Sequence, residues 1–275
     1  MEKLIVFSDL DGTLLDHQTY DFSAALPCLK RLQKNKIPLI LTTSKTTPEV
    51  EDLQGILGLD APFIIENGAA VHLGKDTFSR TLSSRSIKVF GSTYSEICLK
   101  IEQMPKIYRK NFRGFNDMSV QGVAQTTGLP IKQAEQAKRR TASEPFLWNG
   151  DATLFYGLQN WAQGEGLNIL QGGRFYHLSG PCDKAGAIDW IMQRARRCQG
   201  WENVRSIALG DGPNDVAMLA QADIGIVIAN PKGSRIEFGA HQSRRALCSL
   251  HAGPFGWNET LQAILDEFER SQERE

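Results

Sequence analysis

The sequence predicts an α/β protein, with a Rossmann-like, doubly wound parallel sheet core and an inserted α+β cap domain. Near both ends of the chain, apolar runs typical of strands buried on both faces alternate with segments of helical periodicity. Between them this alternation is lost, and at 275 residues the chain exceeds the usual size of one domain. We therefore expect a core of residues 1–84 and 178–275 and an inserted cap of residues 85–177.

The first part of the core shows a strand-helix-strand-helix-strand pattern. Four apolar runs have the length of buried strands, with the last as a hairpin partner of the third: residues 4–7, 37–41, 63–65 and 71–73. Helical spacing separates the first three strands, over residues 23–35 and 48–58. Pro48 suits the first turn of the second helix and Gly58 suits its end.

The cap begins after a change of composition at residues 81–85, and its patterns are mixed. Helical patterns cover residues 94–104 and 131–140, and strand patterns cover residues 146–148 and 174–178. Residues 112–117 are expected to form a loop. Within the second helical pattern, the charge run of residues 138–140 is expected to lie on a solvent-exposed helix face. Trp148 and Trp161 are interpreted as cap core rather than as a platform for a sugar.

The regular alternation returns after Asp183, which is expected to cap a helix over residues 185–197. The remaining predicted elements are two strands separated by a helix and a closing amphipathic helix: residues 207–209, 216–222, 224–228 and 258–268. The second half of the core therefore repeats the parallel-strand pattern of the first.

Composition excludes several classes of protein. Lys+Arg and Asp+Glu both number 31, and this formal charge balance argues against a surface for nucleic acid or membrane. The five cysteines form no C-x-x-C pair, so the sequence indicates neither a disulfide framework nor a structural zinc site. With no basic and apolar leader and no apolar run of roughly 20 residues, we expect a cytoplasmic protein. Monomer and homodimer remain equally open.

Polar side chains follow three of the predicted core strands. They are two acids after the first strand, hydroxyls and a lysine after the second, and two acids after a later one: Asp9 and Asp11, Thr43, Ser44 and Lys45, Asp211 and Asp215. Lys184 begins the helix after the cap. In open α/β sheets, ligands bind at the carboxyl ends of the strands, so we expect these side chains to meet in one crevice.

The side chains in this predicted crevice favour a particular chemistry. Several carboxylates brought together repel one another, and a hard divalent cation with oxygen ligands, above all Mg²⁺, relieves that repulsion. The hydroxyls of Thr43 and Ser44 and the ammonium of Lys184 suit a bound phosphoryl group. A serine or cysteine nucleophile is less favoured because neither Ser44 nor a cysteine has an evident His-Asp partner.

Asp9-Leu-Asp11-Gly-Thr13, Thr43, Lys184 and Gly210-Asp-Gly-Pro-Asn-Asp215 together resemble, in order and separation, the four motifs of the haloacid dehalogenase-like phosphohydrolases. The insertion resembles their type IIB cap. The resemblance implies a Mg²⁺-dependent phosphatase that works through an aspartyl-phosphate.

The resemblance also implies a role for each motif residue. Asp9 would be the nucleophile and Asp11 the acid-base catalyst. The metal ligands would be Asp9, Asp11 through its main-chain oxygen, Asp211 and Asp215. Asn214 would orient the acids, and the phosphate would be bound by Thr43, Ser44 and Lys184.

Five further segments resemble one group of that superfamily, the mannosyl-3-phosphoglycerate phosphatases: residues 43–46, 66–69, 143–146, 171–175 and 253–257. This implies a small phosphorylated sugar or glycosyl-phosphoglycerate as substrate, with mannose or glucose as the sugar, and a place in mannosylglycerate biosynthesis. The substrate's carboxylate and hydroxyls need donors facing the core. The residues expected to bind it are Lys45, Glu66, Asn67, Arg174 and His177. Gly172-Gly173 is either a hinge for cap closure or a plain turn.

Three alternatives remain open from the sequence. Another phosphosugar phosphatase, of the sucrose-phosphate type, would share the same motifs. A sugar phosphomutase would form the same aspartyl-phosphate but would return its phosphoryl group to a sugar. A non-catalytic binding module of the same fold is disfavoured, because binding alone requires neither Asp9 nor Asp11.

Overall fold

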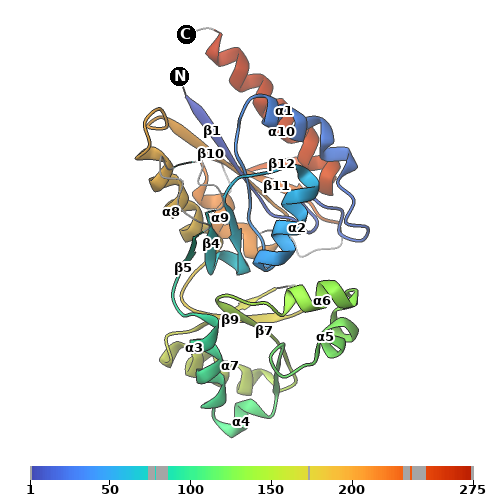
Figure 1. The fold of residues 1–275 in the computed structure, drawn as a ribbon, viewed down its shortest axis with the longest axis vertical. Helices are drawn as coiled ribbons and strands as arrows, with labels where there is room; N and C mark the ends of the chain where they lie inside the picture. Colours follow the sequence, from blue (N-terminus) through green and yellow to red (C-terminus); the bar gives the residue numbers. More distant parts are fainter. Residues whose placement is uncertain are drawn as a thin grey trace.

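The computed structural model describes residues 2–73, 78, 86–172, 174–231, 236 and 246–273. Figure 1 shows two bodies, a larger one that holds both chain ends and a smaller one formed by the middle of the sequence. None of the described helices is long and apolar enough to cross a membrane.

A five-stranded parallel sheet forms the centre of the larger body, in the order β12-β11-β10-β1-β2. In the same order, from one edge of the sheet to the other, the strands are Ala246–Ala252, Ile224–Ala229, Val204–Gly210, Lys3–Ser8 and Leu39–Leu41. β1 and β10 are neighbours although nearly 200 residues separate them, with Ser8 opposite Leu209. The segments that follow these two strands therefore leave the sheet side by side.

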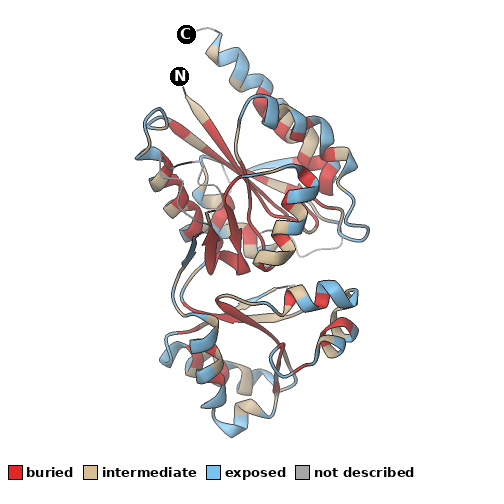
Figure 2. Ribbon diagram, viewed as in Figure 1, coloured by how far each residue is buried: buried red, intermediate tan, exposed pale blue. Residues whose placement is uncertain are grey.

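Helices cover both faces of this sheet, as the doubly wound prediction requires. Leu4 and Val6 of β1 pack with helices α1, α2 and α10, which span Leu26–Lys34, Thr47–Leu57 and Gly253–Gln272. Ile5 and Phe7 point to the other face, against α8 (Lys184–Arg196) and α9 (Val216–Gln221). Burial on both faces explains why β1 is apolar at four successive positions, and Figure 2 shows the buried strands at the centre.

A small antiparallel sheet joins the larger body to the cap. It has the order β3-β4-β5, with strands Phe63–Ile65, Ala70–His72 and Ile87–Val89. A parallel bridge from Thr42 to Ile64 places β3 beside the end of β2. The hairpin predicted for residues 71–73 thus exists, and its second strand, β4, also pairs with a third strand, β5.

The smaller body is a four-stranded antiparallel sheet with helices. In the order β6-β7-β9-β8, its strands are Phe112–Gly114, Ser143–Trp148, Tyr176–Ser179 and Asn168–Gln171. Helices α3, α4 and α7 are Tyr94–Glu102, Lys106–Arg109 and Ala152–Gly164. Trp148 and Trp161 pack against the apolar core that the sheet forms with these helices, as predicted. Helices α5 (Val120–Thr127) and α6 (Ile131–Ala137) enclose a second apolar cluster, and α6 reaches α2 of the larger body.

The chain crosses between the two bodies twice, and the crossings touch. A Cβ atom on Gly180 would lie 2.6 Å from the backbone nitrogen of Ser92, so a side chain does not fit there. The predicted boundary at residues 84 and 85, like the composition change at 81–85, lies outside the described residues. The other predicted boundary, after residue 177, falls inside β9, which pairs with β7 as far as Ser179.

Several predicted elements differ from the observed ones. The loop predicted over residues 112–117 begins with strand β6, whose Gly114 lies against the Glu144 carboxylate. β12 was not predicted because it lies at the sheet edge with only Ser249 buried, so it lacks an apolar run. The predicted helix over residues 131–140 ends at Ala137, so the charged residues 138–140 lie beyond its end.

We expect Trp257→Phe to lower the free energy of unfolding by about 1–3 kcal/mol, through lost packing and one lost hydrogen bond. Trp257 is fully buried, and its Nε1 donates to Ser8 Oγ at 2.9 Å, while that hydroxyl donates to the carbonyl of Asp9 at 2.7 Å. Urea denaturation of wild type, Trp257→Phe, Ser8→Ala and the double variant measures the coupling. Strictly additive losses would contradict a role for the hydrogen bond.

Candidate active site

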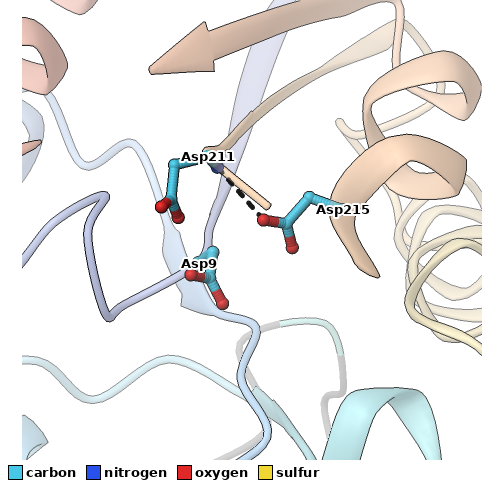
Figure 3. A group of neighbouring side chains, drawn as sticks. All are labelled: Asp9, Asp211 and Asp215. Carbon is cyan, nitrogen blue, oxygen red and sulfur yellow. Dashed lines mark hydrogen bonds between the residues drawn. The ribbon is translucent and has the colours of Figure 1, made fainter. Parts of the chain in front are cut away.

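Three carboxylates meet at the carboxyl ends of β1 and β10. Asp9 follows β1, Asp211 follows β10, and Asp215 ends the short 3-10 helix Pro213–Asp215 that leads into α9. Each offers an oxygen within 4.8 Å of the others, and Figure 3 shows the carboxylates facing a shared space. All three residues are buried. The structure thus brings together acids that the sequence separates by about 200 positions.

Hydrogen bonds fix the two later acids. Thr13 Oγ1 and Asn230 Nδ2 donate to the two oxygens of Asp211 at 2.9 and 2.5 Å. The backbone nitrogens of Asp211 and Gly212 donate to Asp215 Oδ2 at 3.1 and 3.0 Å. Thr13 and Asn230 were not predicted to support the acids. Thr13 lies within the first motif, whereas Asn230 follows β11 without any distinguishing pattern.

Lys184 lies between two of the carboxylates. Its ammonium is 2.6 Å from Asp9 Oδ1 and 2.7 Å from Asp215 Oδ1, with 1% of its side chain exposed. Burial disfavours the charged ammonium, but the charges of Asp215 and Asp9 outweigh this effect and raise the pKa of Lys184. The predicted cap of this helix is present, since Asp183 Oδ1 accepts from Gly186 N at 2.7 Å.

The carboxylates have too little positive charge around them. Burial raises the pKa of Asp9 despite the opposing charge of Lys184, and the neighbouring acids raise it further. Burial and the charge of Asp215 raise the pKa of Asp211. Among the residues that the structure describes, three buried acids thus share one ammonium, and a divalent cation would supply the missing charge. The oxygen donors of this cluster fit a hard cation such as Mg²⁺.

The carboxylate of Asp11 makes a different contact. Lys45 Nζ lies 2.6 Å from Asp11 Oδ2, while Asp11 Oδ1 is buried and has no hydrogen-bond partner among the described residues. Burial opposes the charge on Lys45, but the Asp11 carboxylate raises the pKa of the lysine overall. The predicted acid-base residue and one predicted substrate residue are therefore in direct contact.

The loop after β2 is tied to the turn after β3. Thr43 is 1% exposed, and its carbonyl accepts from Asn67 N at 2.9 Å. Asn214 Nδ2 in turn approaches Asn67 Oδ1 at 3.5 Å. Asn67, a predicted substrate residue, thus connects the predicted phosphate-binding loop at Thr43 with Asn214, the residue predicted to orient the acids.

The turn Glu66–Gly68 has a strained backbone. Glu66, Asn67 and Gly68 all have left-handed φ angles, of 53°, 59° and 94°. A Cβ atom on Gly68 would lie 2.0 Å from the carbonyl oxygen of Asp183, so the turn packs directly against the residue before Lys184. The strain persists because contacts on both sides hold this turn in place.

Glu66 is in contact with the cap. Its side chain is fully buried, and its carboxylate accepts from Thr141 N, Ala142 N and Ser143 Oγ at 2.6, 3.0 and 2.8 Å. Its predicted contact with substrate stays a prediction. The sequence did not indicate that Glu66 joins the two bodies, because the cap segment it binds lies about 75 positions away.

The prediction of a solvated helix face for residues 138–140 is wrong for two of them. Lys138 Nζ donates to the carbonyls of Phe115 and Met118. Arg140 has only 3% of its side chain exposed and contacts Glu66, since the chain turns towards the core once α6 ends. Only Arg139 lies in solvent, 63% exposed.

The two predicted cap residues lie in the smaller body, and both stay predictions as substrate contacts. Arg174 Nη1 donates to the carbonyl of Thr126. His177 lies in β9 between Pro145 and Leu170, and its buried Nδ1 has no hydrogen-bond partner in the part of the chain that the structure describes. Gly172 N donates to Phe175 O at 2.9 Å, which favours a plain turn, while Gly173 lies outside the described residues.

Comparison with known proteins agrees with this geometry. Residues 6–140 and 179–242 match the family model described as haloacid dehalogenase-like hydrolase. The chain belongs to this family. The resemblance inferred from the motifs is thereby confirmed, as is the fold class.

Two curated relatives of this haloacid dehalogenase-like hydrolase carry the same name, glucosyl-3-phosphoglycerate/mannosyl-3-phosphoglycerate phosphatase. The protein from Persephonella marina is 37% identical, with 97% of this chain and 99% of the relative aligned. The one from Methanococcoides burtonii is 36% identical, covering 96% and 97%. A solved structure from Thermoplasma acidophilum has a TM-score of 0.66 at 20% identity, covering 98% and 99% of the two chains.

We expect acid pH to destabilise the protein through His177. Burial, with a smaller contribution from the charge of Arg140, lowers its pKa from 6.5 to about 3. Below about pH 6.5 the imidazole of His177 binds a proton in the unfolded chain but stays neutral in the folded chain, so stability falls as the pH drops towards about 3.

Denaturation of wild type and His177→Asn across this pH range measures the effect, with His17→Asn, at an exposed histidine, as control. Relative to the profile of His177→Asn, the stability profile of wild type should fall by on the order of 1–2 kcal/mol by about pH 5. Parallel profiles for wild type and His177→Asn would show that the histidine is not held neutral.

Proposed function

We propose that this protein is a Mg²⁺-dependent phosphatase that removes phosphate from glucosyl-3-phosphoglycerate or mannosyl-3-phosphoglycerate. The observation that carries the proposal is the buried group of Asp9, Asp211 and Asp215 around Lys184, at the sheet edge where ligands bind. The two relatives named for this activity align over almost their whole length, so the cap and the core are both shared.

In the proposed reaction, a carboxylate oxygen of Asp9 attacks the phosphorus, and the bond from phosphorus to the glycerate oxygen breaks. Asp11 gives its proton to that leaving oxygen. Water, deprotonated by Asp11, then hydrolyses the aspartyl-phosphate, so inorganic phosphate leaves and both aspartates return to their starting state. Glycosylglycerate is the other product.

The other predicted residues are given roles around the phosphate. Lys184, already between Asp9 and Asp215, would contact a phosphoryl oxygen, and Thr43 and Ser44 would donate to the others. Mg²⁺ would be held by Asp9, Asp211, Asp215 and the main-chain oxygen of Asp11, and when bound it supplies charge that lowers the repulsion between phosphate and nucleophile.

Lys45 connects substrate binding to acid-base chemistry in this proposal. Its ammonium neutralises Asp11 in the free protein at 2.6 Å. The carboxylate of a phosphoglycerate ester is an alternative anionic partner for that ammonium, and its arrival would free Asp11 to carry a proton.

We also propose a cytoplasmic location for the protein. The proposed domains are a core of residues 1–84 and 178–275 and a cap of residues 85–177.

Asp9→Asn should lower turnover by on the order of 10³-fold or more while the protein stays folded, because an amide cannot form the acyl phosphate. Phosphate release is measured with Mg²⁺ on both glycosyl-3-phosphoglycerates and on sucrose phosphate, before and after EDTA. Asp52→Asn, at an exposed carboxylate on α2, is the matched control and should behave as wild type.

Four outcomes would contradict this proposal. Near-normal turnover of Asp9→Asn would exclude the nucleophile, and turnover that survives EDTA would exclude the metal. Isomerised sugar phosphate without free phosphate would identify a mutase. Faster hydrolysis of sucrose phosphate than of either phosphoglycerate ester would move the substrate to the sucrose-phosphate type.

A further inference from the structure

Arg140 belongs to the cap but makes its contacts at the boundary with the core. Its two terminal nitrogens donate to the carbonyl of Ser44 at 3.3 and 3.4 Å. Nη2 also donates to Ser143 Oγ at 2.6 Å and lies 3.5 Å from Glu66 Oε2, while Nε donates to Ser143 O at 3.3 Å. With 3% of its side chain exposed, this guanidinium is an internal group of the folded protein.

Glu66 completes the contact from the core side. Its carboxylate binds the backbone of Thr141 and Ala142 and the hydroxyl of Ser143, the same short segment that Arg140 begins. The buried cation from the cap therefore binds the core main chain at Ser44, the buried anion from the core binds the cap main chain at Thr141 and Ala142, and the two charges also contact each other. Removal of either charge leaves its partner buried and poorly neutralised.

The loops held in this way carry the predicted chemistry. Ser44 lies between Thr43, expected to bind phosphate, and Lys45, which is ion-paired with Asp11. Glu66 begins the turn whose third residue, Gly68, packs against the backbone before Lys184. The pair thus touches the two segments that place the hydroxyl and the ammonium of the phosphate site.

We propose that Arg140 is a positioning residue, which with Glu66 holds the segments Thr43–Lys45 and Glu66–Gly68 in the arrangement that binds phosphate. The cap is then more than a cover for substrate, because its residue 140 fixes the loops of the core. The kinetic consequence rests on the proposed phosphatase function, whereas the structural consequence does not.

The interface also offers a matched control. Gln136 of α6 donates to Asp52 Oδ2 at 2.7 Å and approaches the carbonyl of Pro48 at 3.5 Å, so it too joins cap to core. These side-chain contacts are with residues of α2 and not with Thr43–Lys45 or Glu66–Gly68. The main-chain carbonyl of Gln136, which accepts from Thr46 Oγ1 at 3.0 Å, is kept when the residue becomes alanine. Gln136→Ala therefore removes side-chain contacts between the two bodies without touching the loops.

The test compares Arg140→Lys, Glu66→Gln and Gln136→Ala with wild type. Lysine keeps the positive charge but cannot reach Ser44 and Ser143 together as the planar guanidinium does. Amide hydrogen exchange of residues 43–46 and 66–68 should be at least tenfold faster in Arg140→Lys and in Glu66→Gln than in Gln136→Ala. Equal exchange in these variants would overturn the proposal, whatever the protein hydrolyses.

Kinetics then test the link to catalysis. In assays well below each variant's melting temperature, kcat should fall at least tenfold in Arg140→Lys, both for mannosyl-3-phosphoglycerate and for p-nitrophenyl phosphate. Gln136→Ala should keep kcat within twofold. Unchanged kcat in folded Arg140→Lys would overturn the positioning role, and so would an equal loss in Gln136→Ala.

The two proposals fail in different ways. Wild-type protein that hydrolyses none of the phosphate esters would refute the proposed function, and hydrogen exchange would still decide whether Arg140 holds the loops. Active wild type with an Arg140→Lys variant of normal kcat and normal exchange would refute only the positioning role.

Discussion

The site depends on one buried lysine among three buried carboxylates. Lys184 contacts Asp9 and Asp215 directly, and Asp211 completes the group. Most other features of the core serve this arrangement: parallel pairing of β1 and β10 brings Asp9 beside Asp211, Asp183 begins the helix that delivers the lysine, and backbone nitrogens orient Asp215. The remaining negative charge makes the crevice a place for a cation and a phosphate rather than for an apolar ligand.

The two bodies contribute different parts of the arrangement. The parallel sheet supplies the acids, whereas the cap supplies Arg140 and the segment that binds Glu66. The contact that Arg140 and Glu66 make between them is buried and charged, and it ends on the loops after β2 and β3. The strained turn at Glu66 and Asn67 is consistent with this, because two successive left-handed side-chain-bearing residues persist only where surrounding contacts impose them.

Local patterns predicted most of the core. Strands buried on both faces need apolar residues at successive positions, and this requirement made β1, β2, β3, β10 and β11 visible. β12 escaped because an exposed edge strand has no such requirement. In the cap, the charge run at residues 138–140 had the composition of a solvated helix, yet the helix ends at Ala137, and a helix end is decided by packing as much as by propensity.

The sequence by itself determined the family, the fold class and the acids at the strand ends, because each of these is written in short motifs and local periodicity. Tertiary structure alone decided which residues meet: Lys184 between Asp9 and Asp215, Lys45 on Asp11, and Arg140 against Glu66 and Ser44. These pairs join segments from 31 to 175 positions apart. Such pairs form only when the parallel sheet and the docked cap bring distant segments together, and no local pattern records that.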